Sequence, residues 1–167
     1  MGKTLSDSPW SISDSDSDSD TGPVMTMPRT RLTVSVTREY AWEMGHALAN
    51  HDGKCFNPHG HNYRAEVEFS GPISLESGMV VDFDELDKKI KPYLQEQYDH
   101  KFLFNTEDKR FSEDQYGTRV QQEPTAENLA LWIWTKVGYM LFHNAMVKLH
   151  RVTVWETDKA SATIRRS

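Results

Sequence analysis

The stretch Cys55-Phe56-Asn57-Pro58-His59-Gly60-His61 constrains the fold of this chain more than any other. His59 and His61 are two residues apart, so both rings project from the same face if the segment is an extended strand. From Asn62 to Phe69, polar and apolar residues alternate, which is the period of a half-buried strand. The sequence therefore predicts a strand that leaves this motif and carries two imidazoles at its start.

Two imidazoles on one face can bind one small cation of borderline softness, and zinc is the first candidate. A catalytic zinc needs at least three protein ligands and an open position. Among the five remaining histidines, His46 is the best third ligand, because it ends an alternating segment that contains Val34 and Val36. A hairpin between the two strands would bring His46 near His59. On spacing alone, a surface or core position for the histidine pair fits the sequence about as well as a metal site.

Cys55 has three interpretations. A single cysteine is usually a small buried hydrophobe. A thiolate near a cation has a lowered pKa, and it can take a proton or attack a substrate. As a fourth zinc ligand, Cys55 would instead close the site and remove activity. The nearness of the histidine motif favours the second interpretation.

Two further places carry candidate chemistry. Asp99 and His100 could act as a base with its orienting carboxylate, although an irregular loop would be needed to let adjacent side chains meet. Glu156 lies near the end of an apolar strand, where a carboxylate is usually solvated. In a pocket, the same carboxylate would match the paired N–H donors of an aminopyrimidinone edge.

The remaining periodicity gives an element order of strand, strand, helix, helix, strand, strand. Asp82 and Thr125 are the predicted N-caps of the two helices, and Pro92 predicts a kink or an early end in the first. Two strands follow over 147–154 and 160–164. This order indicates an α+β fold with a four-stranded antiparallel sheet and both helices on one face.

Composition bounds the class of protein. The 167 residues predict one domain over 31–167, preceded by a disordered acidic tail at 1–30 that is rich in Ser and Asp. A net charge of −6 argues against nucleic-acid binding. A single cysteine fits a reducing compartment, and no apolar run approaches the roughly 20 residues of a membrane span. We therefore expect a cytoplasmic protein without membrane contact.

Together these residues resemble the 6-pyruvoyltetrahydropterin synthase/6-carboxytetrahydropterin synthase family. The resemblance covers residues 31–166 and rests on six ordered islands of sequence. They are the His46 segment, Gly53-Lys54-Cys55, His59-Gly60-His61-Asn62-Tyr63, Gly78-Met79-Val80-Val81-Asp82-Phe83, Asp99-His100, and Pro124-Thr125-Ala126-Glu127-Asn128-Leu129 with Glu156-Thr157.

The resemblance implies a role for each matching position. His46, His59 and His61 match the ligands of one zinc ion per subunit. Cys55 matches the catalytic cysteine, and Asp99 with His100 matches the pair that acts with it. Glu156 matches the carboxylate that anchors the pterin, while Thr125 and Glu127 match positions that line the pterin pocket.

The implied fold is the tunnelling fold, in which sheets of several subunits form an oligomeric barrel. A homo-tetramer or hexamer is then expected, with active sites between subunits, so Cys55 and the Asp99–His100 pair could come from different chains. The implied substrate is a small molecule, 7,8-dihydroneopterin triphosphate.

Three residues separate Cys55 from His59, which resembles the 6-carboxy-5,6,7,8-tetrahydropterin synthases of 7-deazaguanine and queuosine biosynthesis. These carbon–carbon lyases release acetaldehyde and triphosphate. The alternatives are a 6-pyruvoyltetrahydropterin synthase, which eliminates triphosphate without breaking a carbon–carbon bond, and another pterin side-chain lyase such as an aldolase. A third alternative, of a different class, is a non-catalytic, zinc-stabilised pterin-binding or assembly protein.

Overall fold

The computed structural model describes residues 33–112, 117–140 and 146–167. The tail predicted over 1–30 lies outside the described residues, as do the first two residues of the predicted domain. The described residues all belong to one compact unit, Thr33–Ser167. Its regular elements follow in chain order: β1 (Val34–His46), a short 3-10 helix (Lys54–Phe56), β2 (His59–Gly71), α1 (Phe83–Gln97), β3 (Lys101–Asn105), β4 (Gly117–Val120), α2 (Ala126–Met140), β5 (Lys148–Thr157) and β6 (Ala160–Arg165).

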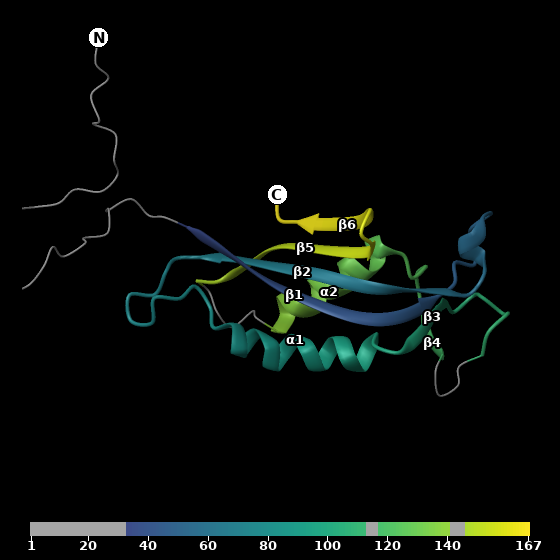
Figure 1. The fold of residues 1–167 in the computed structure, drawn as a ribbon, viewed down its shortest axis with the longest axis horizontal. Helices are drawn as coiled ribbons and strands as arrows, with labels where there is room; N and C mark the ends of the chain where they lie inside the picture. The colour runs from purple at the N-terminus through teal and green to yellow at the C-terminus, as the bar shows by residue number, and fades with distance from the viewer. Residues whose placement is uncertain (1–32, 113–116, 141–145) are drawn as a thin grey trace, which may run out of the picture. The chain divides into compact units, whose positions relative to one another are not determined.

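The sheet has six strands in the order β4-β3-β1-β2-β5-β6 (Figure 1). Antiparallel pairing joins β1 to β2, β2 to β5 and β5 to β6, as the sequence predicts. The prediction of a four-stranded, purely antiparallel sheet is wrong, because β3 pairs with β1, and β4 with β3, in parallel. Both extra strands are short and do not alternate in burial, so their sequences lack the period-2 signal of a half-buried strand.

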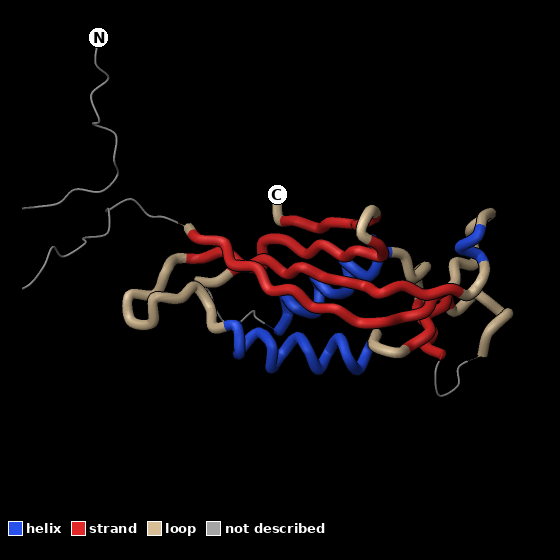
Figure 2. Tube along the Cα trace, viewed as in Figure 1, coloured by secondary structure: helices blue, strands red, loops and turns tan. Residues whose placement is uncertain are grey.

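Both helices lie on one face of the curled sheet, as Figure 2 shows. Asp82 caps α1, because its side chain accepts a hydrogen bond from the backbone N–H of Asp84 at 2.8 Å. The early end predicted at Pro92 is wrong, because α1 continues to Gln97. Pro92 and Lys88 are both exposed, so water can reach the Lys88 carbonyl that the proline leaves without a helical donor.

The hydrophobic core lies between the sheet and the helices. Tyr63, Val67 and Phe69 of β2 are fully buried on the helix-covered face, and the intervening residues are only partly buried. The alternation fixes which side of the sheet each side chain occupies. No helix within the described residues is long and apolar enough to cross a membrane.

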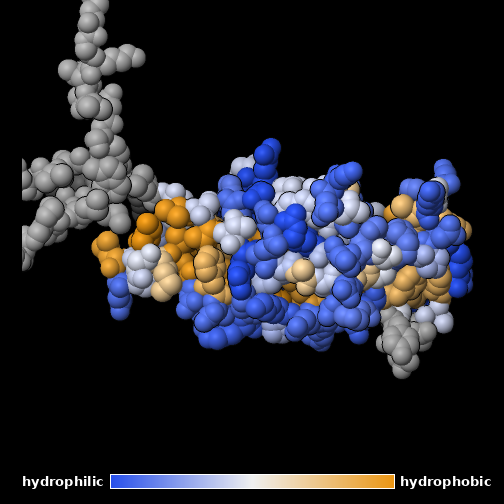
Figure 3. Space-filling view, viewed as in Figure 1, coloured by the Kyte–Doolittle hydropathy of each residue, from blue (hydrophilic) through white to orange (hydrophobic). Residues whose placement is uncertain are grey.

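The surface is mostly hydrophilic, but apolar side chains gather at the end of the sheet where β1 begins (Figure 3). Exposed large apolar residues of the segment between β2 and α1 and of the first turn of α1 lie at this end, and they are Leu75, Met79 and Phe83. Leu75 is 97% exposed. A patch of this kind is typical of a surface that contacts another protein.

Candidate metal centre and active site

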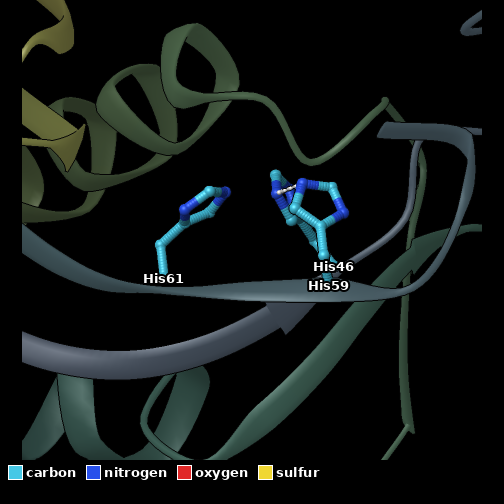
Figure 4. Close-up of side chains that lie close together, drawn as sticks. All are labelled: His46, His59 and His61. Atoms are coloured by element: carbon cyan, nitrogen blue, oxygen red, sulfur yellow. Dashed lines mark hydrogen bonds between the residues drawn. The ribbon is translucent and has the colours of Figure 1, made fainter. Parts of the chain in front are cut away.

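Three histidines from two paired strands converge on the helix-covered face. The β1–β2 register sets His46 opposite His59, and His61 follows two residues later on the same face. One ring nitrogen of each histidine lies within 4.8 Å of the others. Figure 4 shows the three rings rising from the same side of the strands, toward the segment that leads into α2. The hairpin therefore assembles the three predicted ligands.

The backbone fixes the tautomer of two of these rings. His46 Nδ1 lies 2.7 Å from the Pro124 carbonyl oxygen, and His59 Nδ1 lies 2.8 Å from the Asn57 carbonyl oxygen. A carbonyl oxygen can only accept, so both Nδ1 atoms must carry the proton. In the neutral rings, each Nε2 then presents a lone pair.

Those two Nε2 atoms face each other at 3.0 Å. Two lone pairs at this distance repel unless a cation or a proton lies between them. Ligand nitrogens of a tetrahedral zinc ion are about 3.3 Å apart, given Zn–N bonds of about 2.0–2.1 Å. The arrangement thus suits one metal ion bound by three imidazoles, with carbonyl oxygens of the protein orienting two of them.

Burial favours the neutral form of two of these rings, His46 and His61. It lowers the pKa of His46 below the ordinary value of 6.5, although the Pro124 carbonyl opposes the shift. Burial is also the main cause that lowers the pKa of His61. Neutral imidazole is the form that binds a metal, so the lowered pKa values of His46 and His61 favour metal binding.

Glu156 and Tyr63 extend the site along the same face. The Tyr63 hydroxyl lies 3.3 Å from His46 Nε2 and 3.4 Å from Glu156 Oε1. Burial raises the pKa of Tyr63 well above its usual value, and the nearby Glu156 carboxylate adds to this shift. Tyr63 therefore stays protonated and can donate to the carboxylate.

Cys55 lies in a turn formed by residues 53–57, here called the Cys55 turn. Its carbonyl accepts a hydrogen bond from the Leu48 N–H at 2.9 Å, and its side chain is half-buried. The Cys55 turn ends two residues before His59, the first residue of β2. The thiol thus belongs to the same neighbourhood as the histidines.

Asp99 and His100 form a pair, but on the open face of the sheet. His100 has a φ of 56°, and its Nδ1 lies 2.9 Å from Asp99 Oδ1, so the irregular loop lets adjacent side chains meet. Its Nε2 lies 3.6 Å from the carboxylate of Glu43, a residue whose side chain is exposed. Glu43 and His46 project to opposite faces of β1, since they are three residues apart. One chain therefore does not bring the pair to the histidine cluster.

A family model described as 6-pyruvoyl tetrahydropterin synthase matches residues 35–167. The chain belongs to this family. Relatives named 6-carboxy-5,6,7,8-tetrahydropterin synthase include that of Haemophilus influenzae, 31% identical over 73% of this chain and 92% of the relative. The relative of that name from Synechocystis is 31% identical over 76% of this chain and 89% of its own length.

Other similarities support the fold and include the second branch of the family. An uncharacterised protein of Wolinella succinogenes superposes with a TM-score of 0.71 at 20% identity, over 81% of this chain and 99% of its own. The 6-pyruvoyl tetrahydropterin synthase of Caenorhabditis elegans superposes with a TM-score of 0.63 at 27% identity, over 81% of this chain and 97% of its own. A Drosophila melanogaster relative named 6-pyruvoyl tetrahydrobiopterin synthase is 36% identical over 64% of this chain and 58% of its own length.

Thr125 and Glu127, which the family resemblance assigns to the pterin pocket, lie at the start of α2. Thr125 Oγ1 accepts from the Asn128 N–H at 3.4 Å, in agreement with the predicted N-cap. It follows Pro124, the residue whose carbonyl holds His46. Glu127 is exposed in the first turn of the helix.

Tyr63 and the orienting carbonyls of Asn57 and Pro124 were not among the predicted site residues. The alternation that continues from His61 could have placed Tyr63 on the same face of β2. The Pro124 carbonyl could not have been found, because its contact with His46 spans 78 residues of sequence.

The lowered pKa values of His46 and His61 predict an acid-sensitive fold in the metal-free protein. Below pH 6.5, the imidazoles of the unfolded chain bind protons more readily than His46 and His61 do in the folded protein. The free energy of unfolding therefore decreases as the pH is lowered. We expect the melting temperature of the metal-free protein to be nearly constant above about pH 7 and to fall toward about pH 5.5. Thermal unfolding followed by circular dichroism would test this. A melting temperature that rises on acidification would contradict it.

Proposed function

We propose that this protein is a zinc-dependent 6-carboxy-5,6,7,8-tetrahydropterin synthase of 7-deazaguanine and queuosine biosynthesis. Its substrate would be 7,8-dihydroneopterin triphosphate, and its products 6-carboxytetrahydropterin, acetaldehyde and triphosphate. The observation that carries the proposal is the convergence of three imidazoles beside Glu156 and the Cys55 turn. The names of the relatives from H. influenzae and Synechocystis support the same branch.

His46, His59 and His61 would hold the zinc ion, and the two facing Nε2 atoms of His46 and His59 fit that role. When bound, zinc supplies a Lewis acid that polarises oxygens of the substrate side chain and acidifies the neighbouring C–H. A set of three protein ligands would leave a coordination position for the substrate, as a catalytic site requires.

The other residues bind the substrate and move protons. Glu156 would accept the paired N–H donors of the pterin edge, with the Tyr63 hydroxyl holding the carboxylate in place. Thr125 and Glu127 would line the pterin pocket. Cys55, as a thiolate, would remove a proton from the substrate side chain. A zinc ion beside the thiol would favour the thiolate.

His100, oriented by Asp99, would exchange the proton at the other end of the rearranging side chain. Because the pair lies on the open face of its own sheet, we propose that it serves the site of a neighbouring subunit. A homo-oligomer, tetramer or hexamer, would then contain active sites at its subunit interfaces. The exposed apolar patch that includes Leu75, Met79 and Phe83 supports such an assembly.

The proposed reaction is tested by its products. The zinc-loaded protein would be incubated with 7,8-dihydroneopterin triphosphate, and the pterin product weighed by mass spectrometry. The mass of 6-carboxytetrahydropterin, together with acetaldehyde in the same tube, is the expected result. Unchanged substrate under conditions in which zinc is bound would contradict the proposal and favour a non-catalytic pterin-binding role.

A second candidate is 6-pyruvoyltetrahydropterin synthase. The 36% identity to the Drosophila relative named 6-pyruvoyl tetrahydrobiopterin synthase supports it. The same assay distinguishes the two, because a 6-pyruvoyl product retains all side-chain carbons and no acetaldehyde forms. The short spacing between Cys55 and His59 favours the 6-carboxy product.

A further inference from the structure

A single arginine contacts the Cys55 turn from a distant part of the chain. Arg110 follows β3 and is 54 residues from Phe56, yet its Nη1 donates to the Phe56 carbonyl at 2.6 Å. Its guanidinium carbon also lies 3.5 Å from the centroid of the Phe56 ring. One side chain thus binds both the backbone and the ring of the residue that follows Cys55.

Asp108 fixes the orientation of Arg110. Its two carboxylate oxygens accept from Arg110 Nε at 2.9 Å and Nη2 at 2.6 Å, and one of them also accepts from the Arg110 backbone N–H at 3.1 Å. The Asp108 side chain is 2% exposed, and the Arg110 hydrogen bond is the main cause of its lowered pKa. The Asp108 N–H donates to the carbonyl of Asn105, the last residue of β3. The guanidinium is therefore tied to the sheet through a buried, ionised carboxylate.

The Cys55 turn has few anchors of its own. None of its helical residues is buried, and its N-cap is Gly53, which has no side chain to cap the turn. The Gly53 N–H donates to His51 Nδ1 at 2.8 Å. Two further contacts lie on either side of Phe56: the Cys55 carbonyl accepts from the Leu48 N–H, and the Asn57 carbonyl accepts from His59 Nδ1. Arg110 contacts the residue between them. A shift of Phe56 would consequently move both the thiol and the carbonyl that orients His59.

We propose that Arg110, oriented by Asp108, is a positioning residue that holds the Cys55 thiol at its working distance from the metal centre. The inference rests on the proposed role of Cys55 as proton acceptor, but the position of the turn can be measured without turnover. A positive charge at position 110 is not sufficient for this role. The planar guanidinium of Arg110 bonds the Asp108 carboxylate and the Phe56 carbonyl at the same time, and the ammonium group of a lysine lacks this geometry.

The test compares Arg110→Ala and Arg110→Lys with the control Lys109→Ala, which removes the same charge from the neighbouring exposed residue. We expect kcat of the fully zinc-loaded protein to fall about 100-fold in Arg110→Ala, with KM within about 3-fold, since small misplacements of a catalytic group cost this much. Millimolar guanidinium should restore part of kcat in Arg110→Ala, and Arg110→Lys should remain impaired. Lys109→Ala should match the parent protein.

The second measurement is the rate at which iodoacetamide alkylates Cys55 in the zinc-loaded proteins, followed by mass spectrometry. The released turn of Arg110→Ala should react several-fold faster than the parent, and guanidinium should slow it again. If the parent protein shows no turnover but this difference persists, the proposed reaction fails and the positioning role stands. Equal alkylation rates, or a loss of kcat that guanidinium does not relieve, would overturn the positioning role.

Discussion

Cys55→Ala is expected to lower kcat by a factor of about 10³ or more while the protein keeps its zinc. General acid–base groups contribute about 10²–10⁴ to a rate, and no other thiol exists in the chain to replace this one. The metal should remain, because three imidazoles form the proposed ligand set without sulfur. Steady-state turnover and the zinc content of the same preparation measure the two effects separately.

Cys55→Ser is the matched variant, since it nearly preserves the size of the side chain but replaces the thiol by a hydroxyl, which is much harder to deprotonate. It should also be nearly inactive and fully metallated. If either variant loses zinc in proportion to its loss of activity, Cys55 is a fourth metal ligand. The site would then be closed and structural, and the proposed mechanism would fail.

His61→Ala is expected to weaken zinc binding by at least about 100-fold and to abolish turnover with it. Loss of an outer partner of a metal ligand already costs 10–100-fold, so loss of a ligand should cost no less. His61 is the most informative of the three positions, because it is only partly buried, whereas His46 is fully buried and its truncation would also leave a cavity. Competition with a chromophoric zinc chelator measures the change in affinity.

His150→Ala is the control for this experiment. His150 is an exposed residue of β5, and its removal also deletes one imidazole. Zinc affinity and turnover should match those of the parent protein. Equal zinc affinity in His61→Ala and His150→Ala would show that His61 does not bind the metal.

The sequence predicted the parts of the fold that depend on local periodicity. The alternation in β1 and β2 placed His46, His59 and His61 on one face, and the hairpin brings them together as expected. The capping role of Asp82 could also be predicted from the sequence, because an N-cap bonds within the first turn of its own helix. Each of these predictions needed only a residue type and a short spacing.

Features that depend on pairing between distant segments could not be predicted from the sequence. Strands β3 and β4 are short and pair in parallel, β3 with β1 and β4 with β3. Neither a hairpin turn nor an alternating pattern in the sequence therefore indicates them. The contacts of Arg110 with Phe56 likewise join residues whose proximity only the folded sheet creates. The separation of the Asp99–His100 pair from the histidine cluster has the same origin, since the turn before β3 places that pair beside Glu43 on the open face.

X-ray absorption at the zinc K-edge of the zinc-loaded protein would show whether three histidines hold the metal without Cys55. We expect a first shell of nitrogen and oxygen at about 2.0–2.1 Å, with the outer-shell scattering of three imidazoles and no sulfur. This shell corresponds to His46, His59 and His61 with one position left for substrate. A sulfur scatterer at about 2.3 Å would place Cys55 on the metal and contradict its role as the proton acceptor.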